Sequence, residues 1–379
     1  MEREELASWL RLTLTPGIGN IAARKLLAAF GLPADVFAQT AAALQQLVTE
    51  AQAKALLIEP AELASLLDQT LEWLQGAEAH GATRRIRTLG DAGYPASLLE
   101  TADPPLMLYL IGAPALDLTQ LGRSIAMVGS RNPTPQGTLN ARAFARAFGD
   151  AGMPVVSGLA LGIDGAAHEG ALDAAADPGR PATVAVVGTG LDRVYPARHR
   201  ELAHRIAARG LIVSEFPLGT PPLNQNFPKR NRIIAGLSRG TLVVEAALQS
   251  GSLITARLAT EQGKEVFAIP GSIHSPQSRG CHALIRQGAK LVETVADVLE
   301  ELRMDEAAPV AASAPADDAD AAPEHRLLRA MGYDPVSLDA LCARTGCSAA
   351  ELQAQLLEFE LAGRIVRLAG GLFQRVEQG

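Results

Sequence analysis

The chain contains 379 residues, of which 48% are hydrophobic, and carries a formal net charge of −7. This length predicts two or three domains, and the hydrophobic content supports full cores and excludes global disorder. No apolar run approaches the roughly 18 residues that a membrane span requires, and the acidic N-terminus does not resemble a secretory signal. The three cysteines are too few and wrongly spaced for a disulfide framework or a zinc site. We therefore expect a cytoplasmic protein with no membrane, metal or cofactor.

The charge is unevenly distributed along the chain. Residues 1–80 carry 5 Lys/Arg against 10 Asp/Glu, whereas residues 81–300 carry 22 against 18, a net charge of +4. Residues 301–324 carry 1 against 7, and residues 325–379 carry 6 of each. Residues 81–300 are the only positive block, so binding of a polyanion is expected there.

Residues 1–80 predict a small helical domain, because Leu, Ala, Gln and Glu dominate and apolar residues recur at helical spacing. Within this block, Thr15–Asn20 (TPGIGN) resembles the turn of a helix–hairpin–helix motif, whose backbone amides can bind a DNA phosphate. A tight turn between two helices would explain the same residues. Since the block is negatively charged, we favour the tight turn.

Residues 81–302 predict an α/β domain. Its first part, 81–122, is a connector rich in turn signals, with an edge strand expected at Leu106–Ile111. Beyond it, six apolar runs alternate with helical stretches, as in a parallel sheet with right-handed crossovers. The predicted strands are Ile125–Val128, Val155–Val156, Thr183–Val187, Leu211–Val213, Thr241–Val244 and Glu265–Ile269.

The C-terminal quarter divides into a linker and a small domain. Residues 303–323 are rich in alanine, proline and aspartate and predict a flexible acidic linker. Residues 324–379 predict three helices and then a hairpin around Gly370-Gly371, the outline of a winged helix. Such a domain can bind duplex DNA. This tail is electrically neutral and contains no lysine, so contact with another protein is an equally good interpretation.

The first predicted strand of the sheet ends in Gly129, Ser130 and Arg131, before a predicted helix over Thr138–Phe148. A buried strand that ends at a glycine before a helix leaves backbone N–H groups free at the carboxyl edge of the sheet, where phosphate can bind. An arginine adds a bidentate phosphate donor. One such junction is weak evidence, but similar junctions recur along the chain.

The next two junctions contain further titratable residues. Asp164 fits a helix N-cap, and His168 lies four residues later on the same helical face. An acid–base pair would need that proximity. We favour a capping aspartate and a histidine packed against the sheet. After the following strand, Tyr195-Pro196 brings Arg198 and Arg200 to the same edge.

The densest junction is Phe227–Arg232 (FPKRNR), where Lys229, Arg230 and Arg232 stand beside an aromatic residue before an apolar helix. The helix dipole disfavours cations in a first turn, so we interpret them as an anion site. Further on, Ser250-Gly251-Ser252 lies at a predicted helix N-terminus, where small residues let a phosphate reach the amides. The chain has no GxxxxGK[ST] motif and no GxGxxG at its first strand, which argues against ATP hydrolysis and NAD chemistry.

Eight blocks of the sequence closely resemble the DNA-processing protein A family (DprA, also called Smf). In chain order they are VGSRNPTPQG, SGLALGIDGAAHEGAL, VVGTGLDRVYP, SEFP, FPKRNRIIAGLS, EAALQSGSLITARLA, VFAIPGS and GCHALIRQGAKLV. The resemblance covers about residues 89–299. It implies an extended Rossmann domain between a helical SAM-like domain and a winged-helix domain. It also implies a non-enzymatic protein that binds single-stranded DNA, usually dimerises, protects incoming DNA in natural transformation and helps to load the RecA recombinase.

The resemblance also implies which residues contact DNA. Carried over by motif, they are Gly129, Ser130, Arg131, Phe227, Lys229, Arg230 and Asn231, with the amides of Ser250, Gly251 and Ser252 nearby. We add Arg198 and Arg232 to this set. Many members of the family have lysine directly after the Tyr-Pro of the third block, where this chain has Ala197 followed by Arg198. For a dimer interface, Leu284, Ile285 and Leu291 are our candidates, with ordinary core packing as the alternative.

Two other functions fit parts of the sequence. Related Rossmann-like enzymes that cleave nucleoside monophosphates share the glycine-edge layout. In such a phosphoribohydrolase-like enzyme, Glu245 would be the acid/base and Arg131 the phosphate clamp. The Pro-Gly-Gly-x-Gly-Thr signature of those enzymes is missing here. The third interpretation is an adaptor that works mainly through its terminal domains.

Overall fold

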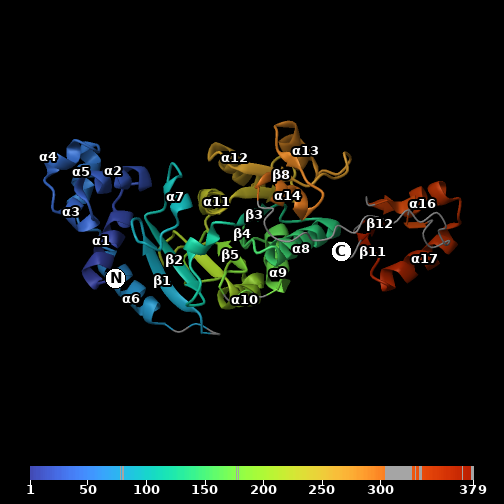
Figure 1. Cartoon of the computed structure of the whole chain (residues 1–379), viewed down its shortest axis with the longest axis horizontal. Coiled ribbons are helices and arrows are strands. Elements are labelled where there is room, and N and C mark those ends of the chain that lie inside the picture. The colour runs from blue at the N-terminus through green and yellow to red at the C-terminus, as the bar shows by residue number, and fades with distance from the viewer. Residues whose placement is uncertain are drawn as a thin grey trace.

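The computed structural model describes residues 1–76, 78, 81–175, 177, 179–303, 327–328, 330–332, 335–368 and 370–376. The chain forms a helical N-terminal part, a central α/β part and a small C-terminal part (Figure 1). Among the described residues, none of the helices combines the length and hydropathy that crossing a bilayer requires. Most of the predicted acidic linker lies outside the described residues.

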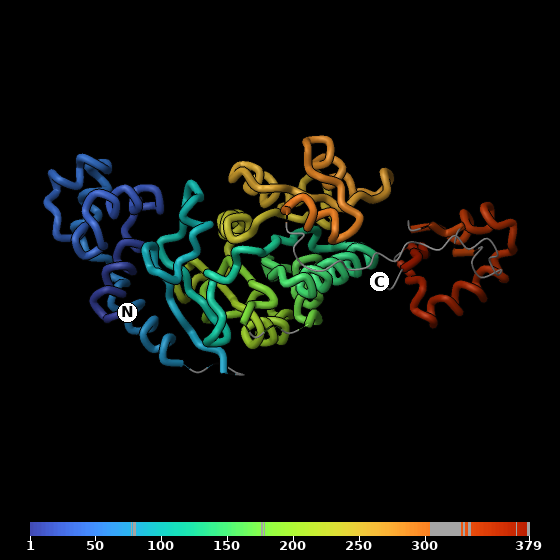
Figure 2. Tube along the Cα trace, viewed as in Figure 1, coloured from blue at the N-terminus to red at the C-terminus, as the bar shows by residue number. Residues whose placement is uncertain are grey.

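The N-terminal part consists of short helices around a common apolar core, drawn in blue in Figure 2. The helices are α1 (Arg3–Leu14), α2 (Asn20–Phe30), α3 (Pro33–Phe37), α4 (Ala41–Gln45), α5 (Glu50–Leu56) and α6 (Leu63–Gln75). The turn between α1 and α2 buries Ile18, and Gln52 Nε2 donates a hydrogen bond to the Gly17 carbonyl oxygen at 2.8 Å. Trp73 packs edge-on against Tyr109 of the central sheet, with ring centroids 5.8 Å apart. The helices and the sheet therefore share one core.

The central part is a nine-stranded, mostly parallel sheet with the strand order β1-β2-β6-β5-β4-β3-β7-β8-β9. The strands are β1 (Thr83–Thr88), β2 (Met107–Gly112), β3 (Ile125–Val128), β4 (Val155–Ser157), β5 (Thr183–Val186), β6 (Leu211–Ser214), β7 (Gly240–Val243), β8 (Glu265–Ala268) and β9 (Lys290–Leu291). The pairs β1–β2 and β2–β6 are antiparallel, and the other pairs are parallel. All six predicted strands are confirmed to within one residue at each end.

Helices cover both faces of this sheet, which explains the continuous apolar runs of its parallel strands (Figure 1). They are α7 (Ala96–Leu99), α8 (Pro135–Asp150), α9 (Ile163–Asp173), α10 (Arg200–Arg209), α11 (Asn226–Leu237), α12 (Ser252–Glu261), α13 (Arg279–Arg286) and α14 (Val295–Glu301), with the 3-10 helices η2 (Leu118–Leu121) and η3 (Ala197–His199). On one face, α11, α12 and α13 pack over a core that includes Ala126 and Val186. The other face is covered by α10 and the N-terminal helices, and farther along by α8, α9 and α14, over residues such as Met127.

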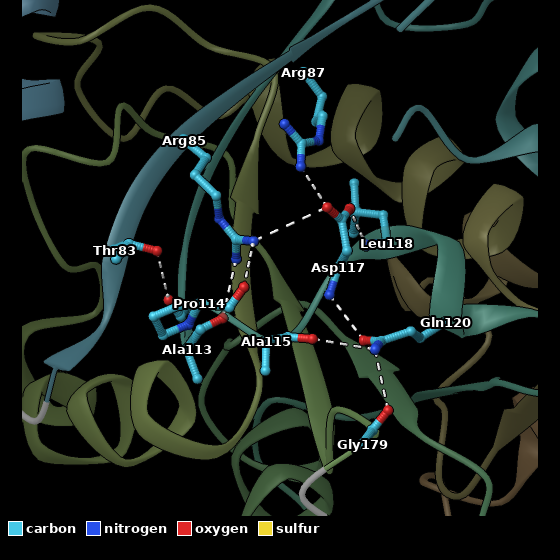
Figure 3. A network of polar contacts seen from close by, with 11 residues as sticks. Thr83, Arg85, Arg87, Ala113, Pro114, Ala115, Asp117, Leu118, Gln120 and Gly179 are labelled. Carbon is cyan, nitrogen blue, oxygen red and sulfur yellow. Dashed lines mark hydrogen bonds and ion pairs between the residues drawn. The ribbon is translucent and has the colours of Figure 1, made fainter. Parts of the chain in front are cut away.

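The strand predicted at Leu106–Ile111 exists as β2, but the prediction that it forms the edge of the sheet was wrong. The edge strand is β1, which pairs with the outer side of β2. Three arginines in β1 (TRRIRT) hide this strand from an apolar pattern. Figure 3 shows Arg85 and Arg87 pointing from β1 toward Asp117, which forms an ion pair with Arg87. Arg85 Nη2 also donates to the Ala113 carbonyl oxygen at 3.3 Å. The arginines therefore attach the edge strand to the connection that follows β2.

The C-terminal part is a small winged-helix domain with a core of its own. Its elements are β10 (Val336–Ser337), α16 (Leu338–Thr345), α17 (Ala349–Leu361), β11 (Ile365–Leu368) and β12 (Leu372–Arg375), with the strand order β10-β12-β11. The predicted hairpin is confirmed, since β11 and β12 pair antiparallel. The short strand β10 was not predicted, because two residues are too few for a pattern.

Candidate nucleic-acid interface

The sheet changes its winding direction at β3. Strands β4, β5 and β6 follow on one side of β3, and β7, β8 and β9 follow on the other. Ligands of open α/β sheets bind outside the carboxyl ends of the strands at such a point. A cavity of about 510 Å³ lies there, and we call it the switch-point groove. Nine of the twelve predicted DNA contacts line it: Gly129, Ser130, Arg131, Phe227, Arg230, Asn231, Ser250, Gly251 and Ser252.

The turn after β3 presents Arg131 and buries Ser130. The Ser130 amide donates to the Glu245 carbonyl oxygen at 2.7 Å, and the Ser130 carbonyl oxygen accepts from the Ile163 amide at 3.1 Å. The Ser130 hydroxyl accepts from the Asn132 amide at 3.1 Å. Hydrogen bonds to two other segments therefore hold Ser130 in place, and Arg131 is the exposed cationic side chain of this turn.

Phe227, in the first turn of α11, is half-buried beside Arg131. The Arg131 guanidinium carbon lies 5.4 Å from the centroid of the Phe227 ring, within the range of a cation–π contact. The Tyr195 ring also packs against the Phe227 ring, with centroids 5.8 Å apart and planes tilted by 30°. Lys229, two residues along α11, is exposed but does not line the groove.

Arg230 lines the groove with little exposed surface, since only 4% of the residue is accessible. Its Nη1 donates to the carbonyl oxygens of Gly158 and Val186, at the carboxyl ends of β4 and β5. Burial lowers the pKa of Arg230 to about 10, and the Asp164 carboxylate opposes that decrease. Arg230 thus remains charged at neutral pH, and its guanidinium donates hydrogen bonds to carbonyl oxygens of the protein itself.

Two glycines at the strand ends make room for these α11 side chains. A Cβ at Gly158 would lie 1.9 Å from Arg230 Nη1, and a Cβ at Gly188 would lie 3.1 Å from Phe227 Cδ1. Gly158 and Gly188, predicted to leave the sheet edge open for a ligand, therefore also make room for the side chains of Arg230 and Phe227.

Arg232 points away from the groove. It forms an ion pair with Glu215 and another with Asp103, at 3.1 Å between Arg232 Nε and Asp103 Oδ2. Its side chain is 14% exposed. Arg232 was among our predicted DNA contacts, and the structure places it in a partly buried ion-pair network instead. Of the three cations in FPKRNR, only Lys229 is exposed.

The opposite wall of the groove begins at the N-terminus of α12. The Ser250 and Ser252 hydroxyl oxygens lie 2.6 Å apart, and the Ser252 amide donates to Ser250 Oγ at 3.3 Å. Asn231 Nδ2 reaches across to the Gly251 carbonyl oxygen at 3.5 Å. Gly251 is exposed, so its backbone is accessible to a ligand in the groove.

Glu245 follows β7 but does not line the groove. Its two carboxylate oxygens accept hydrogen bonds from the Thr134 amide at 2.9 Å and the Thr134 hydroxyl at 2.6 Å. Thr134 is the N-cap of α8, so the Glu245 carboxylate lies at a helix N-terminus, where negative charge is stabilising. Burial raises the pKa of Glu245, and the hydrogen bonds from Thr134 oppose the increase.

Asp164 and His168 form no acid–base pair. The prediction that Asp164 is an N-cap was wrong, because α9 begins at Ile163 and Gly162 precedes it. Asp164 Oδ2 accepts hydrogen bonds from the Gly158 and Ala160 amides at 3.1 and 3.3 Å. Burial raises the Asp164 pKa, while Arg230 and these amides oppose the increase.

The predicted packing of His168 against the sheet is confirmed, because its Nδ1 lies 2.7 Å from Thr183 Oγ1 in β5 and the residue is fully buried. Burial lowers the pKa of His168 to about 3. As the pH falls below 6.5, the unfolded chain therefore binds a proton at this residue and the folded chain does not.

This pKa shift predicts that acid reduces stability through His168. Above pH 6.5 the histidine makes no pH-dependent contribution, and well below it the free energy of unfolding should fall by about 1.4 kcal/mol per pH unit. Urea unfolding of the wild type and of His168→Gln at several pH values between 7.5 and 4.5 gives the free energy of unfolding of each protein as a function of pH. We expect this free energy to fall more steeply with acid in the wild type than in the variant. Parallel stability curves for the two proteins would contradict the prediction.

Four other predicted site residues lie outside the groove. Arg198 is exposed in η3 and lines neither the groove nor the smaller cavity beside Tyr195. Leu284 and Ile285 are half-buried on α13, where they pack against the core. Leu291 is 44% exposed on the edge strand β9.

Sequence reasoning missed several residues around the groove. Tyr195 is one of them, although an aromatic residue between a strand and a helix is itself a signal of a binding surface. The groove is also lined by the amide side chains of Asn132, Asn224, Gln249 and Gln277. These residues come from separate loops and share no motif, so only the fold brings them together. Among the described residues, no group of three or more His, Cys, Asp or Glu side chains could hold a metal ion.

Comparisons with known proteins agree with this architecture. The sequence model of the family described as DNA recombination-mediator protein A matches residues 85–303, and that of the DprA winged helix domain matches residues 311–371. The chain is 42% identical to Protein Smf of Escherichia coli over 312 residues, which cover 80% of each chain.

Two solved structures are also similar to the chain. The X-ray structure of DprA from Streptococcus pneumoniae has a TM-score of 0.63 and 35% identity and covers 79% of this chain and 98% of that one. A structure of DNA processing protein A from Helicobacter pylori, described for its single-stranded DNA binding mode, has a TM-score of 0.51 and 31% identity. It covers 58% of this chain and 97% of that one.

Proposed function

Since the chain belongs to the DNA recombination-mediator protein A family (DprA/Smf), we propose that it binds single-stranded DNA in the switch-point groove. The observation that carries this proposal is the position of Arg131, an exposed guanidinium 5.4 Å from the Phe227 ring in a cavity that also contains the N-terminus of α12. A cation, an aromatic ring and the positive end of a helix dipole together suit a phosphate and its base. The single-stranded DNA binding described for the Helicobacter pylori relative supports this class of ligand.

The groove geometry favours single strands over duplex DNA. Phe227 is half-buried within the groove, so a base reaches its ring only when the base is unstacked and unpaired. In a duplex both faces of each base are already stacked. We therefore expect binding that tolerates any sequence, depends on salt and prefers single strands.

We further propose that the bound strand is incoming DNA in natural transformation, and that the protein protects it in the cytoplasm and helps to load RecA onto it. The family's description as a recombination mediator supports this role. We propose a homodimer that uses the surface around Leu284, Ile285 and Leu291, of which Leu291 offers the most exposed side chain. Joining two grooves would strengthen binding through effective concentration.

We propose that this role is not enzymatic. Glu245, the acid/base of the alternative nucleotide-cleaving function, uses both carboxylate oxygens on Thr134 and does not line the groove. The enzyme hypothesis would require it to face a ligand bound near Arg131. No observation favours that second function.

We assign DNA binding to the groove and not to the winged-helix domain. In a helix-turn-helix protein, the second helix enters the major groove of DNA and needs cations to meet the phosphates. The corresponding helix, α17, contains no lysine or arginine and carries Glu351, Glu358 and Glu360. Its residues Leu357 and Leu361 are 57% and 82% exposed. This surface suits a protein better than a polyanion.

Fluorescence anisotropy of labelled oligothymidine tests the proposed function directly. We expect tight binding at low salt, affinity that falls linearly on a log–log plot as salt rises, and poor competition by an equal-length duplex. Absence of binding at low salt would contradict the proposal. Equal competition by the duplex would contradict the strand preference.

A further inference from the structure

Among the described residues, Tyr195 is the only exposed aromatic residue. It is 46% accessible, whereas the remaining described Phe, Tyr and Trp residues are half-buried or buried. Its hydroxyl forms no hydrogen bond with any described residue. Single exposed apolar residues are common on proteins, so exposure alone assigns no role. The position of Tyr195 beside the switch-point groove does.

Tyr195, Phe227 and Arg131 form a stacked series. The Tyr195 and Phe227 ring centroids are 5.8 Å apart with planes tilted by 30°, and the Arg131 guanidinium lies 5.4 Å from the Phe227 centroid. Phe227 also lies close to Gly188, where an added Cβ would lie 3.1 Å from Phe227 Cδ1. Of the two rings, Phe227 is half-buried and Tyr195 is exposed.

A second, smaller cavity extends the groove toward Tyr195. Its lining includes Tyr195 and Leu161, and it shares Arg131 and Phe227 with the switch-point groove. Leu161 is 37% exposed, so the apolar surface beside the tyrosine is also accessible. The volume of this cavity is about 70 Å³, which is too small to enclose a nucleobase. A base at this position would therefore lie over the exposed tyrosine ring and not inside a pocket.

We propose that Tyr195 is a base-stacking residue that extends the DNA-binding surface beyond the groove. A strand whose phosphate binds Arg131 places one base near Phe227 and a neighbouring base on the exposed face of Tyr195. Phe227 supports the tyrosine from below, as one ring supports another in a stacked pair. Stacking on an aromatic ring accepts any base, which agrees with a mediator that must bind every sequence. This inference rests on the proposed function of the groove.

The test compares Tyr195 variants in oligothymidine binding. Tyr195→Ala should weaken binding roughly 5- to 150-fold, and Tyr195→Phe should stay within about twofold of the wild type. Tyr195→Leu retains an apolar contact with Phe227 but has no aromatic face, so it should resemble the alanine variant. Because no charge is removed, the salt dependence should remain unchanged in all three. Leu99→Ala, at an exposed leucine that lines neither cavity, is the matched control and should bind like the wild type.

Two further measurements separate stacking from an indirect effect. An oligonucleotide with abasic sites should bind the wild type and Tyr195→Ala equally, since no base remains to stack. In Tyr195→Trp, addition of oligothymidine should quench the fluorescence of the new tryptophan, whereas Trp9 and Trp73 are buried. If Tyr195→Ala binds oligothymidine like the wild type, or loses as much affinity for the abasic strand, the inference is overturned. Failure of the wild type to bind oligothymidine would overturn the proposed function itself.

Discussion

Arg131→Ala should reduce the affinity for single-stranded DNA roughly 10- to 100-fold for every sequence. Arg131 is the exposed cation of the turn after β3, and a hydrogen bond from a charged donor to a phosphate contributes about 1.5–3 kcal/mol. Loss of one phosphate contact on a single strand should also lower the slope of log K against log salt by about 0.7. Anisotropy titrations of oligothymidine and of a mixed sequence at several salt concentrations measure both quantities.

The matched control for Arg131 is Arg146→Ala. Arg146 lies on α8 outside the groove, with a side chain that is 65% exposed, and it forms an i,i+4 ion pair with Asp150. Removing it changes the net charge by the same amount and should alter binding far less. Both variants should keep the stability of the wild type to within about 0.5 kcal/mol, as surface substitutions usually do. If Arg131→Ala and Arg146→Ala have the same affinity and salt slope, Arg131 does not contact DNA.

Arg230→Ala should destabilise the fold by about 3–5 kcal/mol, because it removes a buried guanidinium from its partners. Without it, the carbonyl oxygens of Gly158 and Val186 lose their side-chain donor, and the buried Asp164 loses the charge that most opposes the rise of its pKa. The loss in DNA affinity should follow from disorder at the sheet edge. Urea unfolding followed by circular dichroism gives the change in free energy.

Lys229→Ala provides a control from the neighbouring residue. Lys229 is exposed, so its removal should leave the free energy of unfolding nearly unchanged and should weaken DNA binding only modestly. Arg230→Ala combined with Asp164→Asn should recover part of the lost stability, because the buried carboxylate is then neutral. A stable Arg230→Ala variant with a reduced salt slope would instead show that this arginine contacts phosphate directly.

The central sheet was predictable because its strands are buried on both faces. Such strands are apolar at most positions, and the six runs from Ile125 to Ile269 therefore stand out without any partner being known. Strand β1 was not predicted, because it is rich in arginine and has no continuous apolar run. Arg85 and Arg87 project toward Asp117, a residue about 30 positions away in the sequence, so the strand character of β1 depends on a neighbour that the local pattern does not reveal.

For the candidate site, the order of strands and helices along the chain was enough to predict which segments meet. Parallel strands place their carboxyl ends on one edge, and this brings the turn at Arg131, the start of α11 and the start of α12 together. The role of each side chain there depends on contacts that form only in the folded chain. Successive residues of a helix point about 100° apart, so Lys229 faces solvent, Arg230 faces the carbonyl ends of the strands, and Arg232 faces Glu215. Three cations that are equivalent in the motif therefore differ in role, because burial and partners come from segments far away in the chain.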